Sequence, residues 1–139
     1  MSAEENKATI RYWVEEAWNK GNMTIADEMY TATYILHDSS GPIDGPAGLT
    51  QFITMFRIAF PDLHMTIEDQ ITEGDKVAWR FTVRGTHNGE FMGIPPTGKP
   101  VTVTGTVISR FGDGKWQEDW SNFDALGMLQ QLGVLPSMG

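Results

Sequence analysis

The spacing of apolar residues changes at Pro61-Asp62, and this change constrains the fold more than any other feature of the sequence. Before it, apolar residues recur every three or four positions, from Ile10 to Trp18 and from Leu49 to Phe60. This spacing predicts helices. After it, apolar and polar residues alternate, as in 77–83 and 101–107. Alternation predicts strands with one buried face. The sequence therefore indicates helices first and a sheet afterwards.

Cap and turn residues divide the chain further. Ser2 and Glu5 form a capping-box pattern, and Gly21 stands where a glycine is expected after a helix. Thr33 to His37 predicts a short strand, and Pro46 suits the first turn of the second long helix. Four long strands are predicted next, followed by a short helix over 126–132.

The order of these elements predicts the architecture. Consecutive strands that are joined by short turns pair antiparallel. One face of such a sheet must be covered, and the N-terminal helices are available to cover it. We therefore predict one α+β domain over residues 1–139. In it, a curved, mostly antiparallel sheet wraps the N-terminal helices around a conical pocket.

Charge and cysteine content exclude several classes of protein. The formal net charge is −8, with cations scattered from Lys7 to Lys115, so nucleic acids and anionic membranes are poor partners. The chain has no cysteine, which excludes a disulfide scaffold, a thiol nucleophile and thiolate metal sites. Neither a signal peptide nor a membrane-spanning segment is evident, so we expect a cytoplasmic protein.

The three histidines do not indicate a metal site. His37, His64 and His87 lie far apart and lack the close helical spacing of a zinc protease. A site assembled from three strands stays open, but hydrogen-bonded histidines at strand ends are the simpler interpretation. We expect no metal and no cofactor. His37 follows an apolar strand and is the histidine most expected to face a cavity.

The last strand carries the candidate chemistry. Strict alternation places Trp116, Glu118, Trp120 and Asp124 on one face. A carboxyl group on a tryptophan-rich face has a raised pKa, which suits proton transfer. Asp124 also precedes the last helix, so two roles stay open for it: helix cap and acid/base group. If a bulge shifts the alternation, Asp119 or Glu118 takes its place.

Three segments resemble the SnoaL-like polyketide cyclase family. They are the loop 84–99 (RGTHNGEFMGIPPTGK), the segment 59–62 (AFPD) and the ending 120–133 (WSNFDALGMLQQLG). His37, followed by a glycine-containing loop and a helix, also fits the family. The resemblance covers nearly the whole chain, in order.

This resemblance implies the NTF2-like fold, a cone of curved sheet and helices. It also implies cofactor-free ring closure of a polyketide-like small molecule by intramolecular aldol condensation. The acid/base aspartate of the family lies on the last strand, and the shared context matches it to Asp124. His37 and Tyr12 are then candidate donors to the enolate oxygen. The expected substrate contacts are Tyr12, Trp13, Phe56, His87 and Trp120.

Two other functions stay open at this point. The same cavity would serve a non-catalytic protein that binds an apolar small molecule, or another NTF2-like isomerase or hydrolase. NTF2-like proteins resemble one another in pairing through the open sheet face. The face that carries Arg80, Thr102, Thr104 and Thr106 therefore predicts a homodimer or a larger homo-oligomer.

Overall fold

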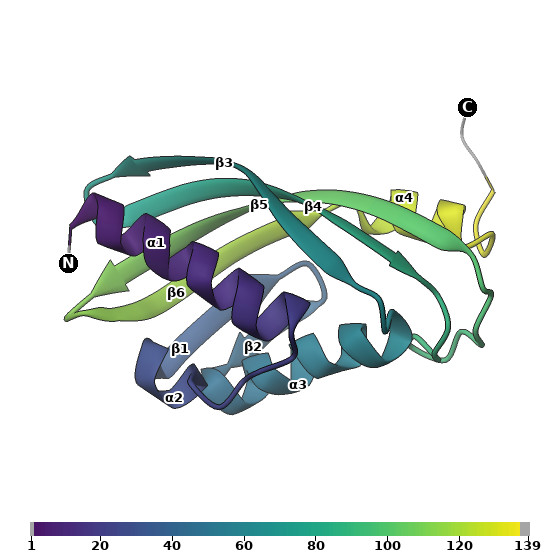
Figure 1. Cartoon of the computed structure of the whole chain (residues 1–139), viewed down its shortest axis with the longest axis horizontal. Coiled ribbons are helices and arrows are strands. Elements are labelled where there is room, and N and C mark those ends of the chain that lie inside the picture. Colours follow the sequence, from purple (N-terminus) through teal and green to yellow (C-terminus); the bar gives the residue numbers. More distant parts are fainter. Residues whose placement is uncertain (1, 137–139) are drawn as a thin grey trace.

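The chain begins with helices, continues through two strands and one long helix, and then forms four consecutive strands and a short last helix (Figure 1). The computed structural model describes residues 2–136. Its elements are α1 (Ala3–Trp13), the π-helical η1 (Val14–Asn19), α2 (Ala26–Met29), β1 (Tyr30–Asp38), β2 (Gly41–Asp44), α3 (Gly45–Ala59), β3 (His64–Glu73), β4 (Lys76–Thr86), β5 (Pro100–Gly112), β6 (Lys115–Phe123) and α4 (Ala125–Gln131).

The helix ends follow from local sequence signals. Ser2 caps α1 through the Glu5 backbone amide, and the Glu5 side chain accepts a hydrogen bond from the Ser2 backbone in return. This confirms the predicted capping box. Pro46 lies in the first turn of α3, where its missing amide hydrogen costs nothing. The single first helix that the spacing predicts is instead split, because its second half widens into η1.

Six strands form one sheet in the order β2-β1-β6-β5-β4-β3. Neighbouring strands pair antiparallel except β1 and β6, which pair parallel. In Figure 1 the long strands arch over α1 and α3, which lie on the same side of the sheet. The predicted α+β fold with a curved sheet is confirmed. Strand β2 adds a short edge strand that the alternation pattern does not predict.

Apolar side chains of the helices and of the concave sheet face form the core. Ile10 and Trp13 from α1 are buried, as are Ile53 from α3, Val77 from β4 and Val107 from β5. A second cluster at the other end includes Phe60, Phe91, Val101, Met128 and Leu132. The core thus extends along the whole concave face of the sheet.

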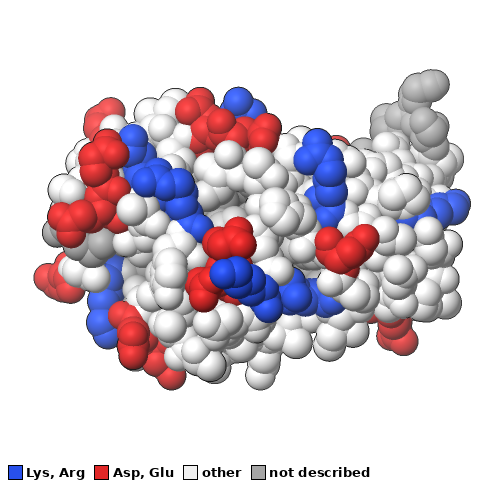
Figure 2. Space-filling view, in the orientation of Figure 1, with Lys and Arg blue, Asp and Glu red and all other residues white. Residues whose placement is uncertain are grey.

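One face of the molecule carries charged side chains of both signs (Figure 2). On the face seen in Figure 2, acidic and basic side chains are interspersed, and no large patch of one sign forms. Within residues 2–136, none of the helices combines the length and the apolar character that crossing a membrane requires.

Candidate active site in the cavity of the sheet

A cavity lies between the concave sheet face and the helices. Its volume of about 90 Å³ is several times the ~15 Å³ that one water molecule needs, so it is a genuine cavity rather than a packing defect. The wall is almost entirely aromatic and aliphatic. Its polar side chains are those of Asp38, Asp119, Ser121 and the two tyrosines Tyr30 and Tyr34.

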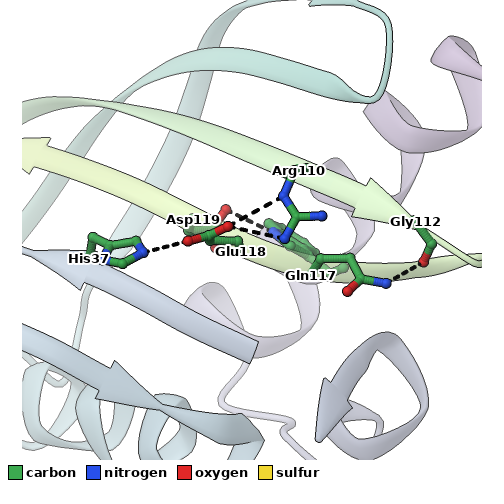
Figure 3. Close-up of polar contacts among 7 residues, drawn as sticks. His37, Arg110, Gly112, Gln117, Glu118 and Asp119 are labelled. Atoms are coloured by element: carbon green, nitrogen blue, oxygen red, sulfur yellow. Dashed lines mark hydrogen bonds and ion pairs between the residues drawn. The ribbon is translucent and has the colours of Figure 1, made fainter. Parts of the chain in front are cut away.

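A bulge in β6 decides which carboxyl group enters this cavity. Phe111 pairs with Trp116 and Arg110 with Glu118, so Gln117 is the extra residue between them. The Gln117 side chain donates to the Gly112 carbonyl at 2.7 Å (Figure 3). The bulge shifts the alternation by one position. As a result, Trp116 and Asp119 share the concave face.

The strict alternation predicted for this strand is therefore wrong. Trp116 lies on the same wall as Asp119, Ser121 and Phe123, and all four line the cavity. Glu118 lies on the other face, where it contacts His37 and Arg110 (Figure 3). The bulge therefore shifts the alternation in the way that makes Asp119, rather than Asp124, the candidate carboxyl group.

Asp119 is held by three neutral donors and is only 5% exposed. Tyr34 Oη donates to Oδ2 at 2.6 Å, and Trp116 Nε1 donates to Oδ1 at 2.7 Å. The Ser109 hydroxyl also donates to Oδ1 and is itself fixed by Trp79 Nε1 at 3.0 Å. Four residues from four strands therefore fix the orientation of one carboxyl group.

The environment of Asp119 raises the pKa of its carboxyl group toward neutral pH. Burial raises the pKa of Asp119 from 3.8 to about 6, while the hydrogen bonds from Ser109, Tyr34 and Trp116 oppose that rise. Burial and the nearby Asp119 charge raise the pKa of Tyr34 well above its ordinary value. At neutral pH the Tyr34 hydroxyl is therefore a donor, and Asp119 is ionised with a raised affinity for a proton.

Asp124 lies outside the cavity. It is exposed and caps α4, with its Oδ1 accepting from the Gly127 amide at 2.9 Å. The capping role that the sequence predicts is confirmed. Its acid/base role stays a prediction, and the geometry favours Asp119 for that role.

Two of the other predicted site residues lie on the wrong face for the cavity. His37 stacks on Trp120 with ring centroids 5.5 Å apart, and His37 Nε2 lies 2.6 Å from Glu118 Oε2. Both rings are on the outer face of the sheet, because β1 presents Tyr34 and Leu36 inward and His37 outward. The prediction that His37 faces the cavity is therefore wrong.

The remaining predicted contacts divide into three groups. Trp13 and Phe56 line the cavity. Tyr12 is 53% exposed on the outer side of α1, away from the cavity wall. His87 is fully buried beside Phe60, where its Nδ1 accepts from the Thr97 amide at 3.2 Å, but it does not line the cavity.

Sequence reasoning missed the partners of Asp119. Ser109 follows Val103 and Val107 at inward positions of β5, so it is a polar residue on an otherwise apolar face. In β1, Tyr34 likewise brings a polar group to a buried, inward position. Such a residue needs a buried hydrogen-bond partner. Within the described part of the chain, no cluster of three or more His, Asp and Glu residues is arranged to hold a metal ion.

Comparison with known proteins identifies the family of this chain. The sequence profile of the SnoaL-like polyketide cyclases matches residues 8–132. The chain belongs to the SnoaL-like polyketide cyclase family. A curated relative, the nogalonic acid methyl ester cyclase of Streptomyces nogalater, is 30% identical over 122 residues, which cover 84% of this chain and 90% of that protein.

Solved structures of SnoaL-like proteins show the same fold. AclR, a candidate hydroxylase from Streptomyces galilaeus, is 32% identical with a TM-score of 0.88, and the match covers 99% of this chain and 87% of AclR. IdmH, a candidate polyketide cyclase from Streptomyces antibioticus, is 35% identical with a TM-score of 0.79, over 92% of this chain and 98% of IdmH. The fold is NTF2-like, as the resemblance implied.

Proposed function

We propose that this SnoaL-like protein closes a ring in a polyketide-like small molecule by intramolecular aldol condensation, with Asp119 as the acid/base group. The observation that carries the proposal is the oriented carboxyl group of Asp119, which has a raised pKa in a largely apolar cavity. The similarity to a polyketide methyl ester cyclase supports the same reaction class.

The hydrogen bonds of Asp119 leave room for one proton. A carboxylate has about four lone-pair positions. Three of them accept from Ser109, Trp116 and Tyr34, so one position on Oδ2 stays free. That position can take a proton from a carbon flanked by two carbonyl groups. Because such a carbon is already acidic, a base of this strength suffices.

The remaining steps need no other reagent. The enolate carbon attacks a carbonyl carbon of the same molecule, which forms the new carbon–carbon bond and leaves an alkoxide. Protonated Asp119 then returns its proton to that alkoxide, so substrate and product are isomers. The apolar wall holds the chain folded for this attack and keeps water away.

The rival function is binding without catalysis in the same cavity. Asp119 would then serve only to hold Tyr34, Ser109 and Trp116 in place. A comparison of Asp119→Asn with Asp124→Asn separates the two, since Asn keeps the size of the side chain in both cases. The assay follows cyclisation of a β-dicarbonyl polyketide methyl ester by chromatography and mass spectrometry.

We expect Asp119→Asn to lower turnover by roughly a hundredfold or more, which is the usual contribution of an acid/base group. Asp124→Asn should keep turnover and melting temperature, because Asn caps a helix about as well as Asp. Circular dichroism checks that both variants fold. Full turnover in Asp119→Asn would remove Asp119 from the chemistry, and a loss confined to Asp124→Asn would return the role to Asp124.

A further inference from the structure

A chain of hydrogen bonds crosses the concave face of the sheet and ends on Asp119. Trp79 Nε1 of β4 donates to the Ser109 hydroxyl of β5 at 3.0 Å, and Ser109 donates to Asp119 Oδ1. Ser109 pairs directly with Asp119 in the β5–β6 ladder. It also pairs with Val77 of β4, and Trp79 lies two positions farther along the same face. Trp79 is thus connected to the candidate carboxyl group through Ser109.

The first member of this chain fixes its direction. An indole N–H is only a donor, so the Ser109 oxygen accepts from Trp79 and the Ser109 hydrogen points elsewhere. Asp119 Oδ1 is the acceptor that this hydrogen meets. Ser109 is fully buried, so solvent does not compete for its hydroxyl group. The Ser109 hydroxyl is therefore held as a donor to Asp119.

The two oxygens of Asp119 have different kinds of partner as a result. Oδ1 accepts from Ser109 and from Trp116 Nε1, and this indole is again only a donor. A proton on Oδ1 would face the hydrogens of both donors. Oδ2 accepts from the Tyr34 hydroxyl, which can rotate and can either donate or accept. The proton of Asp119 is therefore confined to Oδ2.

We propose that Trp79 is a positioning residue for the reaction: by holding the Ser109 hydroxyl on Oδ1, it directs the proton of Asp119 to Oδ2 and helps to keep the carboxyl group ionised at neutral pH. The inference rests on the proposed acid/base role of Asp119 and adds a residue that acts through another one. A donor to a carboxylate stabilises the charged form, and a second donor behind the first strengthens that bond. In agreement, the hydrogen bond from Ser109 lowers the pKa of Asp119 against the effect of burial.

The other ionisable groups around Asp119 are few. Glu118 is its neighbour in β6, but it lies on the outer face and pairs with Arg110. Strand β1 brings the remaining groups to the cavity wall, and they are Tyr30, Tyr34 and Asp38. The helices and the strands β3, β4 and β5 add no Asp, Glu, His, Lys, Arg or Tyr to the described wall. Variants of the hydrogen-bonded chain leave all of these groups in place.

The test follows the Asp119 carboxyl group by ¹³C NMR from pH 4 to pH 9, with Asp119→Asn to assign the resonance. Ser109→Ala should raise the titration midpoint by about one pH unit, as for the loss of a hydrogen bond to a charged group. Trp79→Phe should raise it by about 0.3–0.5 pH unit, because it only weakens that bond. Trp13→Phe is the matched control, since Trp13 lines the same cavity from α1 and packs against Tyr30. Its midpoint should equal that of the parent.

A double variant decides whether Trp79 acts through Ser109. In the Ser109→Ala background, Trp79→Phe has no hydroxyl to release, so the midpoint should stay where Ser109→Ala places it. A parent-like midpoint in Trp79→Phe would overturn the inference. An equal rise in Trp13→Phe would also overturn it, as would a full further rise in the double variant. Circular dichroism checks that each variant is folded across the titration range.

Turnover keeps this inference separate from the proposed function. If Asp119 is the acid/base group, the acid limb of kcat/KM should move to higher pH in Ser109→Ala and Trp79→Phe, by the same amounts as the NMR midpoints. If Asp119→Asn stays fully active while the midpoints respond as expected, the acid/base role fails and the connection from Trp79 to Asp119 stands. Unchanged midpoints would overturn that connection even if Asp119→Asn is inactive.

Discussion

The burial of Asp119 lowers the stability of the folded protein at neutral pH. Its carboxyl group is buried in an apolar wall, and even three hydrogen bonds do not bring its pKa back to 3.8. Ionisation of this group is therefore harder in the folded protein than in the unfolded chain. Replacing it by a neutral side chain of the same size removes that cost.

The pH dependence of stability follows from this difference. Between about pH 4 and pH 6 the folded protein binds a proton at Asp119 more tightly than the unfolded chain does. The contribution of Asp119 is therefore most favourable below pH 4 and is lost as the pH rises through 6. The difference of about two pKa units corresponds to about 3 kcal/mol.

Urea unfolding of the parent and of Asp119→Asn from pH 4 to pH 7 measures this contribution. Relative to the variant, the parent should lose up to about 3 kcal/mol of unfolding free energy across the window. Asp62 and Glu118 have lowered pKa values and act in the opposite direction. They are present in both proteins, so the difference isolates Asp119. Parallel pH profiles would contradict the assignment.

At the scale of elements, the strands were predictable and the bulge was not. Alternation in β4 and β5 reports directly which side chains are buried, and the cap of α4 follows from Asp124 and its neighbours. Gln117 is an extra residue only because of how β6 pairs with β5. The local sequence contains no pattern that predicts this bulge. One shifted residue exchanges the two faces of the strand, so the candidate carboxyl group changed from Asp124 to Asp119.

Strand β5 carries a second feature that pairing explains. Gly105 lies opposite Phe81 of β4, whose ring lines the cavity. A Cβ atom at Gly105 would come within 2.4 Å of the Phe81 ring and 2.9 Å of the Asn122 carbonyl oxygen. Because Gly105 has no side chain, the Phe81 ring can occupy this space.

Gly105→Ala should therefore destabilise the fold by about 1–3 kcal/mol, as overpacking usually does. Urea unfolding measures the loss. Gly112→Ala in the same strand is the matched control, since its nearest neighbour, the flexible Gln117 amide, would be 3.3 Å away. That variant should stay within about 0.5 kcal/mol of the parent. Equal stability of the two variants would show that Phe81 can move aside.

At the scale of the whole molecule, no helix within residues 2–136 covers the outer sheet face (Figure 1). Thr102, Thr104, Thr106 and Ile108 of β5 are exposed there, as is Arg80 of β4. We expect two copies to pair through this face. Light scattering at micromolar concentration should give about twice the 15.5 kDa of one chain. Thr104→Arg, at the centre of the face, should shift the mass toward one chain. A parent mass near 15.5 kDa would contradict the expectation.

The parallel pairing of β1 with β6 has a consequence for synthesis. Tyr34 and Asp119, which meet in the cavity, lie 85 positions apart in the chain. In the sheet order, β6 joins the β2-β1 pair to β5-β4-β3. Until β6 is made, no strand joins β2-β1 to β5-β4-β3, and the edges of β1 and β5 that β6 covers in the folded protein have no partner. Those edges can pair with other chains in the meantime. The cell's chaperones thus have most to protect in the interval before the last strand is made.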